Sequence, residues 1–171
     1  MKKLLLIIMI MLMPAIALSQ KSATAEVTAT VQAELTLVKD VDIDFGNLSA
    51  TSTPILDPKD VAHTDVGQGY TVGEFTIGGS NGVGINVAHD ATVTLGDGTN
   101  TMTYTPVIFG HEDTQSASSL VTNGGNVTLG ATGYKLWVDG NLGTLSSQAT
   151  GVYTASAGNG SGLFTIIIEY N

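Results

Sequence analysis

The stretch Ala-Thr-Ala-Glu-Val-Thr-Ala-Thr-Val-Gln-Ala-Glu-Leu-Thr-Leu, residues 23–37, decides the fold class, because apolar and polar side chains alternate along its whole length. A period of two is the pattern of a β-strand with one buried face. Extended, the segment would run about 50 Å at roughly 3.3 Å per residue, whereas a strand usually spans about 17–20 Å. We therefore expect part of it to lie outside its own sandwich, or to cross from one sheet to the other.

The rest of the chain continues the β pattern. Threonine (23 residues) and glycine (21) are abundant while only 12% of residues are charged, a balance that favours pleated strands and turns. Residues 49–69 have the composition of a long surface loop, and Asp139-Gly140 is typical of a tight hairpin turn. The sequence predicts an all-β antiparallel sandwich, with further strands at residues 40–46, 70–77, 83–89, 91–95, 101–109, 120–122, 127–129, 134–138, 142–145, 152–155 and 163–170.

The first residues have the organisation of a secretory signal peptide. Two lysines precede an apolar run at residues 4–13, and Ala17-Leu18-Ser19 offers small side chains for cleavage before Gln20. The apolar run is too short to span a bilayer, which needs about 20 residues. We expect a secreted protein, in the periplasm or at the cell surface of a bacterium, with no membrane span in the mature chain. The expected organisation is residues 1–19 signal peptide, 20–38 N-terminal strand or donor-strand extension, and 39–171 β-sandwich domain.

Charge and cysteine content exclude several classes of function. Removal of the signal peptide would leave four lysines and no arginine against 15 acidic residues. A phosphate backbone repels such a surface, so nucleic acid is excluded as a partner. The chain has no cysteine, which removes thiol nucleophiles, zinc–thiolate sites and disulfides.

No motif in the sequence indicates catalysis. His63, His89 and His111 stand apart from any catalytic spacing, and the glycine-rich runs lack the context of phosphate-binding loops. We expect no enzyme activity, no cofactor, and exposed histidines without a role. Trp137 between Leu136 and Val138 is expected in the core rather than as an outward sugar-binding platform.

Asp40, Asp42 and Asp44 form the best ligand-like cluster. On a strand their carboxylates share one face about 7 Å apart, which is too far for one Ca²⁺ without help from a neighbouring loop. A solvated strand face and a calcium site both remain open from the sequence.

The pattern resembles a bacterial family of exported proteins, domain of unknown function forty-four-oh-two. The residues that carry the resemblance are Asp42-Ile43-Asp44-Phe45-Gly46, Leu136 to Leu142, Gly151-Val152-Tyr153-Thr154 and Phe164 to Asn171. That family is similar to pilins of the spore-coat-protein-U and chaperone–usher kind, which are incomplete immunoglobulin-like sandwiches completed by the N-terminal extension of a neighbour. The chain departs from the spore-coat-protein-U type by lacking cysteine for a disulfide.

The resemblance implies an immunoglobulin-like, pilin-like sandwich whose partners are copies of itself or related subunits and a periplasmic chaperone. The implied function is a structural subunit of a pilus-like or fibrous surface assembly; a monomeric adhesin or carbohydrate-binding module is the alternative. The expected donor-strand residues at the subunit interface are Ala23, Ala25, Val27, Ala29 and Val31. The final strand is expected to complete the core through Phe164, Ile166, Ile168 and Tyr170, which share one face.

Overall fold

The computed structural model describes residues 24–171, so the expected signal peptide lies outside the described residues. The chain divides into two units, Met1–Val31 and Gln32–Asn171. Within the described part, no helix has the length and apolar character needed to cross a membrane. The strands are β1 (Thr36–Val41), β2 (Ile55–Leu56), β3 (Gly73–Gly78), β4 (Gly84–His89), β5 (Val93–Gly96), β6 (Thr101–His111), β7 (Ser119–Leu120), β8 (Gly125–Thr128), β9 (Tyr134–Asn141) and β10 (Ile166–Tyr170), and a short 3₁₀ helix, η1 (Gln115–Ala117), precedes β7. The all-β prediction is confirmed.

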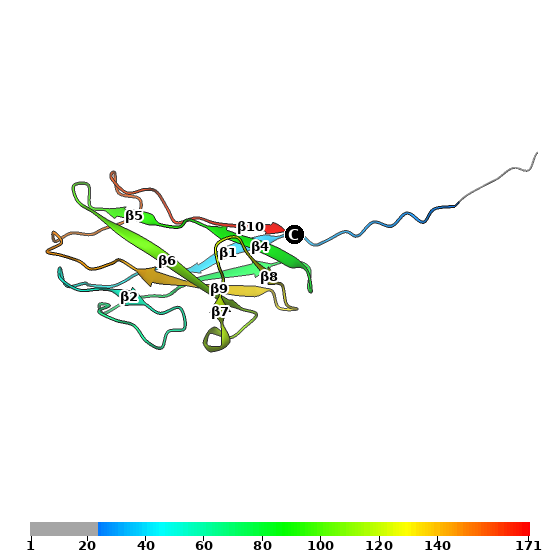
Figure 1. The fold of residues 1–171 in the computed structure, drawn as a ribbon, viewed down its shortest axis with the longest axis horizontal. Helices are drawn as coiled ribbons and strands as arrows, with labels where there is room; N and C mark the ends of the chain where they lie inside the picture. The colour runs from blue at the N-terminus through cyan, green and yellow to red at the C-terminus, as the bar shows by residue number, and fades with distance from the viewer. Residues whose placement is uncertain (1–23) are drawn as a thin grey trace, which may run out of the picture. The chain divides into compact units, whose positions relative to one another are not determined.

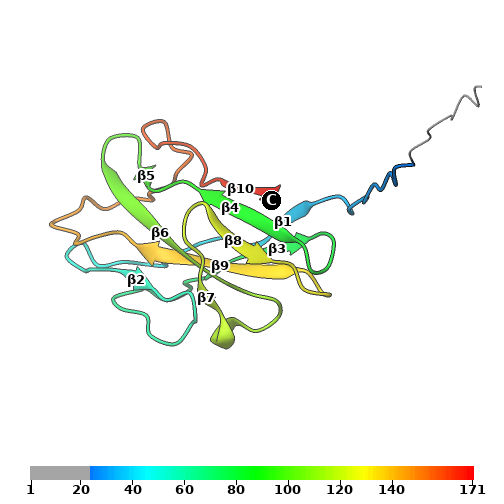
Figure 2. The same ribbon diagram turned by 45° about the vertical axis from the view of Figure 1, so that its right-hand side comes forward.

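The strands of the second unit form two antiparallel sheets (Figures 1 and 2). The larger sheet has the order β1-β3-β9-β6-β5, with β2 added to β9 and β7 added to β6. The smaller sheet has the order β10-β4-β8. The long strand β6 pairs with two strands, one after the other along its length: residues 101–104 pair with β5, and residues 105–111 pair with β9.

The core consists of two clusters of buried side chains. The first cluster joins the two sheets: β4 of the small sheet contributes Ile85 and Val87, and the larger sheet contributes residues such as Ile77, Ile108 and Leu136. The second cluster surrounds Tyr104 and includes buried side chains from β2, β5 and the loops. Ile43 and Phe164 pack against both clusters and so connect them.

The strand expected at residues 23–37 is much shorter than its sequence pattern. Ladder pairing begins at Thr36, and residues 24–35 belong to no strand. The partner strand β3 sets this limit: its last residue, Gly78, lies opposite Thr36, so β3 has no further residue to pair with the chain before Thr36. The alternation of apolar and polar residues thus begins well before the first residue that is paired in a sheet.

The prediction of a hairpin turn at Asp139-Gly140 is wrong. Both residues lie inside β9, which continues to Asn141 and pairs with β6 on one side and with β3 and then β2 on the other. Gly140 has φ +146°, and a Cβ there would lie 2.0 Å from the Thr105 carbonyl oxygen. The glycine is therefore required by the close approach of β6 and not by a turn.

Two further expected strands, residues 142–145 and 152–155, are also absent as strands. Leu142 and Leu145 are buried in the second cluster, yet their N–H groups bond to Pro54 and Ser52 in the loop before β2 rather than to a ladder. Thr154 makes a single bridge to Gly96. In residues 142–145, buried apolar side chains on irregular backbone account for the error, whereas Val152 is 81% exposed.

Candidate functional site

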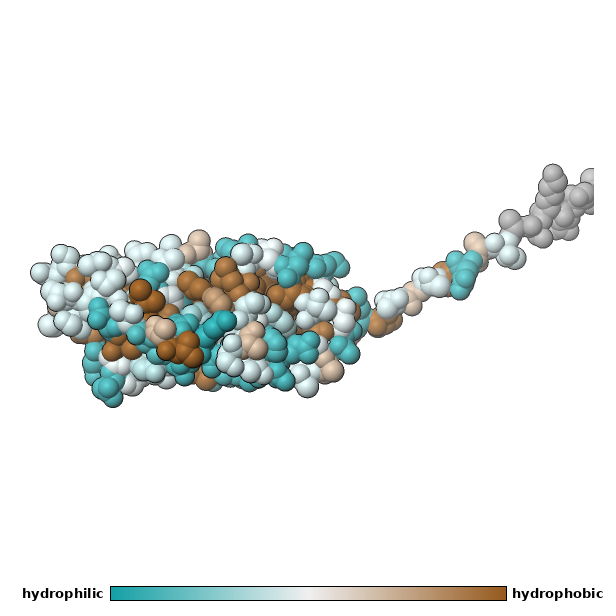
Figure 3. Space-filling view, turned by 60° about the horizontal axis from the view of Figure 1, so that its bottom comes forward, coloured by the Kyte–Doolittle hydropathy of each residue, from teal (hydrophilic) through white to brown (hydrophobic). Residues whose placement is uncertain are grey.

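The expected donor residues lie in the unit Met1–Val31. Ala25, Val27, Ala29 and Val31 are exposed and belong to no strand, with Val27 92% and Val31 94% exposed. Ala23 lies outside the described residues. Figure 3 shows brown and pale side chains following one another along this segment. The segment thus presents main-chain hydrogen-bonding groups and apolar side chains without a strand partner among the described residues.

The start of the compact unit is tied to its last strand by Tyr170. The Tyr170 hydroxyl donates to the carbonyl oxygen of Ala33 (2.8 Å) and accepts from the Ser80 N–H (3.1 Å). The Ala33 N–H donates to Ser80 Oγ at 2.7 Å. Leu35 and Leu37, which follow directly, pack against the first core cluster. Residues 33–37 are therefore held in the compact unit by both polar and apolar contacts.

The C-terminal strand packs one face on the core. Ile166, Ile168 and Tyr170 contact the first cluster, and Phe164, just before the strand, contacts both. The intervening Ile167 is 54% exposed. The core-facing residues of β10 are only half-buried, whereas Ile85 and Val87 on the neighbouring β4 are fully buried. The apolar face of the small sheet is thus incompletely covered at β10.

The other side of β10 is a free sheet edge. In its register with β4, Thr165 lies opposite Asp90 and Asn171 opposite Gly84, and these two pairs carry main-chain hydrogen bonds. Alternate residues of an antiparallel strand point their N–H and C=O groups to opposite sides. The main-chain groups of Ile166, Ile168 and Tyr170 therefore point away from β4, and β10 ends the described small sheet.

The acidic strip at Asp40, Asp42 and Asp44 does not converge. The register of β1 shifts between Lys39 and Val41, which breaks the alternation that would place the carboxylates on one face. Asp40 accepts a hydrogen bond from Thr76 Oγ1, Asp42 pairs with Lys39, and Asp44 caps the Gly46 N–H. Among residues 24–171 no group of three or more His, Asp or Glu side chains is arranged to hold a metal ion.

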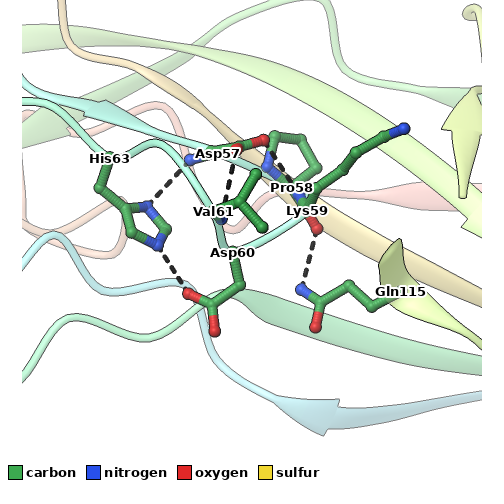
Figure 4. A network of polar contacts seen from close by, with 7 residues as sticks. All are labelled: Asp57, Pro58, Lys59, Asp60, Val61, His63 and Gln115. Carbon is green, nitrogen blue, oxygen red and sulfur yellow. Dashed lines mark hydrogen bonds and ion pairs between the residues drawn. The ribbon is translucent and has the colours of Figure 1, made fainter. Parts of the chain in front are cut away.

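A network of polar contacts lies in the loop after β2, residues 57–63, here called the strap (Figure 4). Its base is closed by two main-chain hydrogen bonds of 2.9 Å between Ile55 and Thr64. Inside it, the carboxylate of Asp57 accepts from the N–H groups of Lys59 (3.0 Å) and Val61 (3.3 Å). Its outer end is held by Gln115, whose side-chain amide donates to the Pro58 carbonyl oxygen at 2.8 Å.

His63 closes this network and is not the solvated loop histidine expected from the sequence. Its side chain is 11% exposed; Nδ1 accepts from the Asp57 N–H at 3.1 Å, and Nε2 lies 2.6 Å from Asp60 Oδ1. Its ring lies 4.4 Å from that of Tyr70, between centroids. The strap is seven residues long, and its turn brings His63 back to Asp57 and Asp60.

Asp139, a buried carboxylic acid beside the strap, is not marked by any motif in the sequence. Asp139 is 0% exposed, and neither of its carboxyl oxygens has a hydrogen-bond partner among the described residues. Burial, with smaller contributions from the charges of Asp57 and Asp60, raises the pKa of Asp139 to about 8. The acid is therefore protonated at neutral pH. The signal that could have located it is the unbroken apolar run Leu136–Val138, which continues the strand into Asp139.

Trp137 is 4% exposed, so its expected place in the core is confirmed and a sugar-binding platform at this residue is excluded. A hollow of about 370 Å³ lies beside the strap. Its lining is largely apolar: Ile55, Leu56, Asp57, Pro58, Ala62, Val107, Gly140 and Asn141.

No protein-family model matches the sequence, and no curated protein matches it significantly. The pilin-like resemblance therefore stays a prediction, and function must be argued from the residues themselves.

Proposed function

We propose that this chain is a secreted structural subunit of a pilus-like or fibrous surface assembly of a bacterium, in which copies join by β-strand exchange. The observation that carries the proposal is the alternating segment at residues 24–31, whose apolar side chains are exposed. An unpaired alternating strand is a template for pairing with another chain. Strand addition gains main-chain hydrogen bonds along an edge and seats alternate side chains in pockets.

The edge of β10 supports a receiving site in the same chain. Its core-facing side chains are half-buried, and its outward main-chain groups at Ile166, Ile168 and Tyr170 point away from β4. A strand added there would cover this apolar face and pair these groups at once. We propose residues 25–31 of a second copy as the occupant, with Val27 and Val31 as the anchors and the alanines in shallower positions.

The finer fold assignment belongs to the same proposal. Two antiparallel sheets that share one core are compatible with an immunoglobulin-like sandwich that lacks a strand beside β10. Related pilin-like subunits could take the place of identical copies, and a periplasmic chaperone would cover the β10 edge before assembly.

The test is filament formation by the mature protein and by the double variant Val27→Asp, Val31→Asp. Two carboxylates on the inserted face would have to be buried unpaired, so we expect assembly to be abolished. The matched control is Thr28→Asp, Thr30→Asp, which adds the same charge to the opposite face and should retain assembly. Electron microscopy and sedimentation velocity report both results.

An unaltered mature protein that stays a monomer, with residues 23–31 paired inside its own sandwich, would refute strand exchange. In that case the monomeric adhesin becomes the leading function.

A further inference from the structure

The buried carboxyl group of Asp139 lies on a strand that is paired on both sides, and beside a loop, the strap, that is not part of a ladder. Its strand β9 is paired with β6 along residues 135–141 and with β3 along residues 134–138. The strap, in contrast, has no ladder partner of its own: it is attached by its base at Ile55 and Thr64, by the side-chain hydrogen bond from Gln115, and by the ring contacts of Lys59 with Phe109 and of His63 with Tyr70. If close packing over Asp139 becomes unfavourable, we therefore expect the strap to move rather than β9.

The register of β2 places the strap against Asp139. Leu56 lies opposite Gly140, so the chain enters the strap at Asp57, next to Asp139. The strap brings Asp57 and Asp60 toward the buried acid, and both charges act on it. Its other charged groups are occupied elsewhere: Lys59 Nζ lies over the ring of Phe109, 5.4 Å from the centroid, and His63 is bonded to Asp60.

The neighbouring strand supplies no compensating donor for the carboxyl group. Tyr104 of β6 donates its hydroxyl to the main-chain oxygen of Asp139 at 2.7 Å. Burial raises the pKa of Tyr104 well above its usual value, so this hydroxyl stays protonated and remains committed to the main chain. On β3, Glu74 forms an ion pair with Lys135 of β9. Lys135 lies four residues before Asp139 along β9, so this pair does not reach the buried carboxyl group.

We propose that the strap, residues 57–63, is a proton-dependent latch that lies closed on β9 while the Asp139 carboxyl group holds its proton and lifts when that proton is lost. Ionised Asp139 would be a buried charge with no hydrogen-bond donor among the described residues, and the negative charges of Asp57 and Asp60 in the strap would repel it. Burying an unpaired charge is far more costly than exposing a loop. Lifting the strap admits water to Asp139 and separates the like charges.

The base and interior of the strap favour opening as a unit. The Asp57 carboxylate holds the N–H groups of Lys59 and Val61, so the strap keeps its internal bonds when it lifts. The contacts that must break are the hydrogen bond from Gln115 to Pro58, the approach of Lys59 Nζ to the Phe109 ring and the ring contact of His63 with Tyr70. Because burial raises the pKa of Asp139 to about 8, opening is expected across mildly alkaline pH, with the closed form at neutral and acidic pH.

Cleavage after Lys59 by a lysine-specific protease tests the latch. Cleavage rates of the mature protein are measured from pH 6.5 to 9.5, with products identified by mass, and each rate is divided by that of an unstructured lysine peptide at the same pH. We expect the normalised rate to rise at least tenfold with a midpoint near pH 8. In Asp139→Asn, which keeps the shape without the charge, the rate should stay low throughout, while the control Glu169→Gln should behave as the unaltered protein.

A flat profile in the unaltered protein, or an equal rise in Asp139→Asn, would overturn the latch. If the Asn variant does not fold, the ¹³C carboxyl titration of Asp139 in the unaltered protein decides. The proposal is supported if Asp139 titrates with the same midpoint as the rise in cleavage rate. It is refuted if Asp139 titrates below pH 5, or if it titrates without any change in the cleavage rate.

Discussion

At the scale of single residues, Asp139 shows how tertiary context reverses a local signal. Asp-Gly is a strong hairpin pair in isolation, but here the aspartate is buried in a central strand and the glycine accommodates a neighbouring backbone. The same misreading hid the most perturbed acid among residues 24–171. His63 also differs from the expected exposed histidine, since the turn of the strap itself brings it to Asp57 and Asp60.

The stability of the protein should fall with pH because of Asp139. Its folded-state pKa of about 8 lies above its unfolded value, so the folded chain keeps a proton that the unfolded chain releases. The free energy of unfolding should therefore decrease between about pH 4 and pH 8, by up to about 1.4 kcal/mol per pH unit from this group alone. Asp139→Asn should remove this part of the slope and be relatively more stable at pH 8. Urea unfolding at pH 5, 6, 7 and 8 measures the difference, and parallel profiles for the two proteins would contradict it.

At the scale of elements, strands with clear turn signals were predicted well and the start of the first strand was not. Strands β3, β4, β5 and β6 lie within a few residues of their predicted positions, because Gly-rich turns bound them in the sequence. The first strand begins 13 residues later than its alternation suggested, since pairing depends on the length of β3. Alternation reports the face that a segment can bury, but the partner decides how much of it is paired.

The last strand gives a direct test of this face assignment. Ile166 packs on the first core cluster and Ile167 is 54% exposed. Ile166→Asp should bury an unpaired carboxylate and cost several kcal/mol, whereas Ile167→Asp should cost about 0.5 kcal/mol or less. Chemical unfolding of the two variants side by side measures the difference. Equal losses would show that β10 does not pack one face inward.

At the scale of the whole molecule, composition alone was sufficient for the fold class, and residue-level reasoning could not place the strap. Abundant threonine and glycine with few charges predicted the all-β chain. The strap depends on contacts between segments far apart in the sequence, such as Gln115 with Pro58 and the pairing of Leu56 with Gly140. Such contacts follow from sheet order, which no local pattern contains.

The two core clusters should unfold together. Ile43 and Phe164 pack against both, so loss of one cluster removes contacts from the other. The single tryptophan, Trp137, is 4% exposed and will report the loss of packing by a red shift of its emission. We expect the fluorescence and far-UV circular dichroism transitions in urea to coincide, as in two-state unfolding. Separate midpoints would mean that the clusters are independent.

The hydrogen bond from the Tyr170 hydroxyl to Ala33 has a mechanical consequence. In the proposed fibre, tension would enter a subunit near residue 33 and pass to the next subunit through β10, and these two points are joined directly. Load would then run along β1 and β10, leaving β9 and the strap largely unstressed. A fibre built in this way could be stretched while each subunit kept its core closed, and its resistance to force would be set by the rate at which these two edge strands come apart.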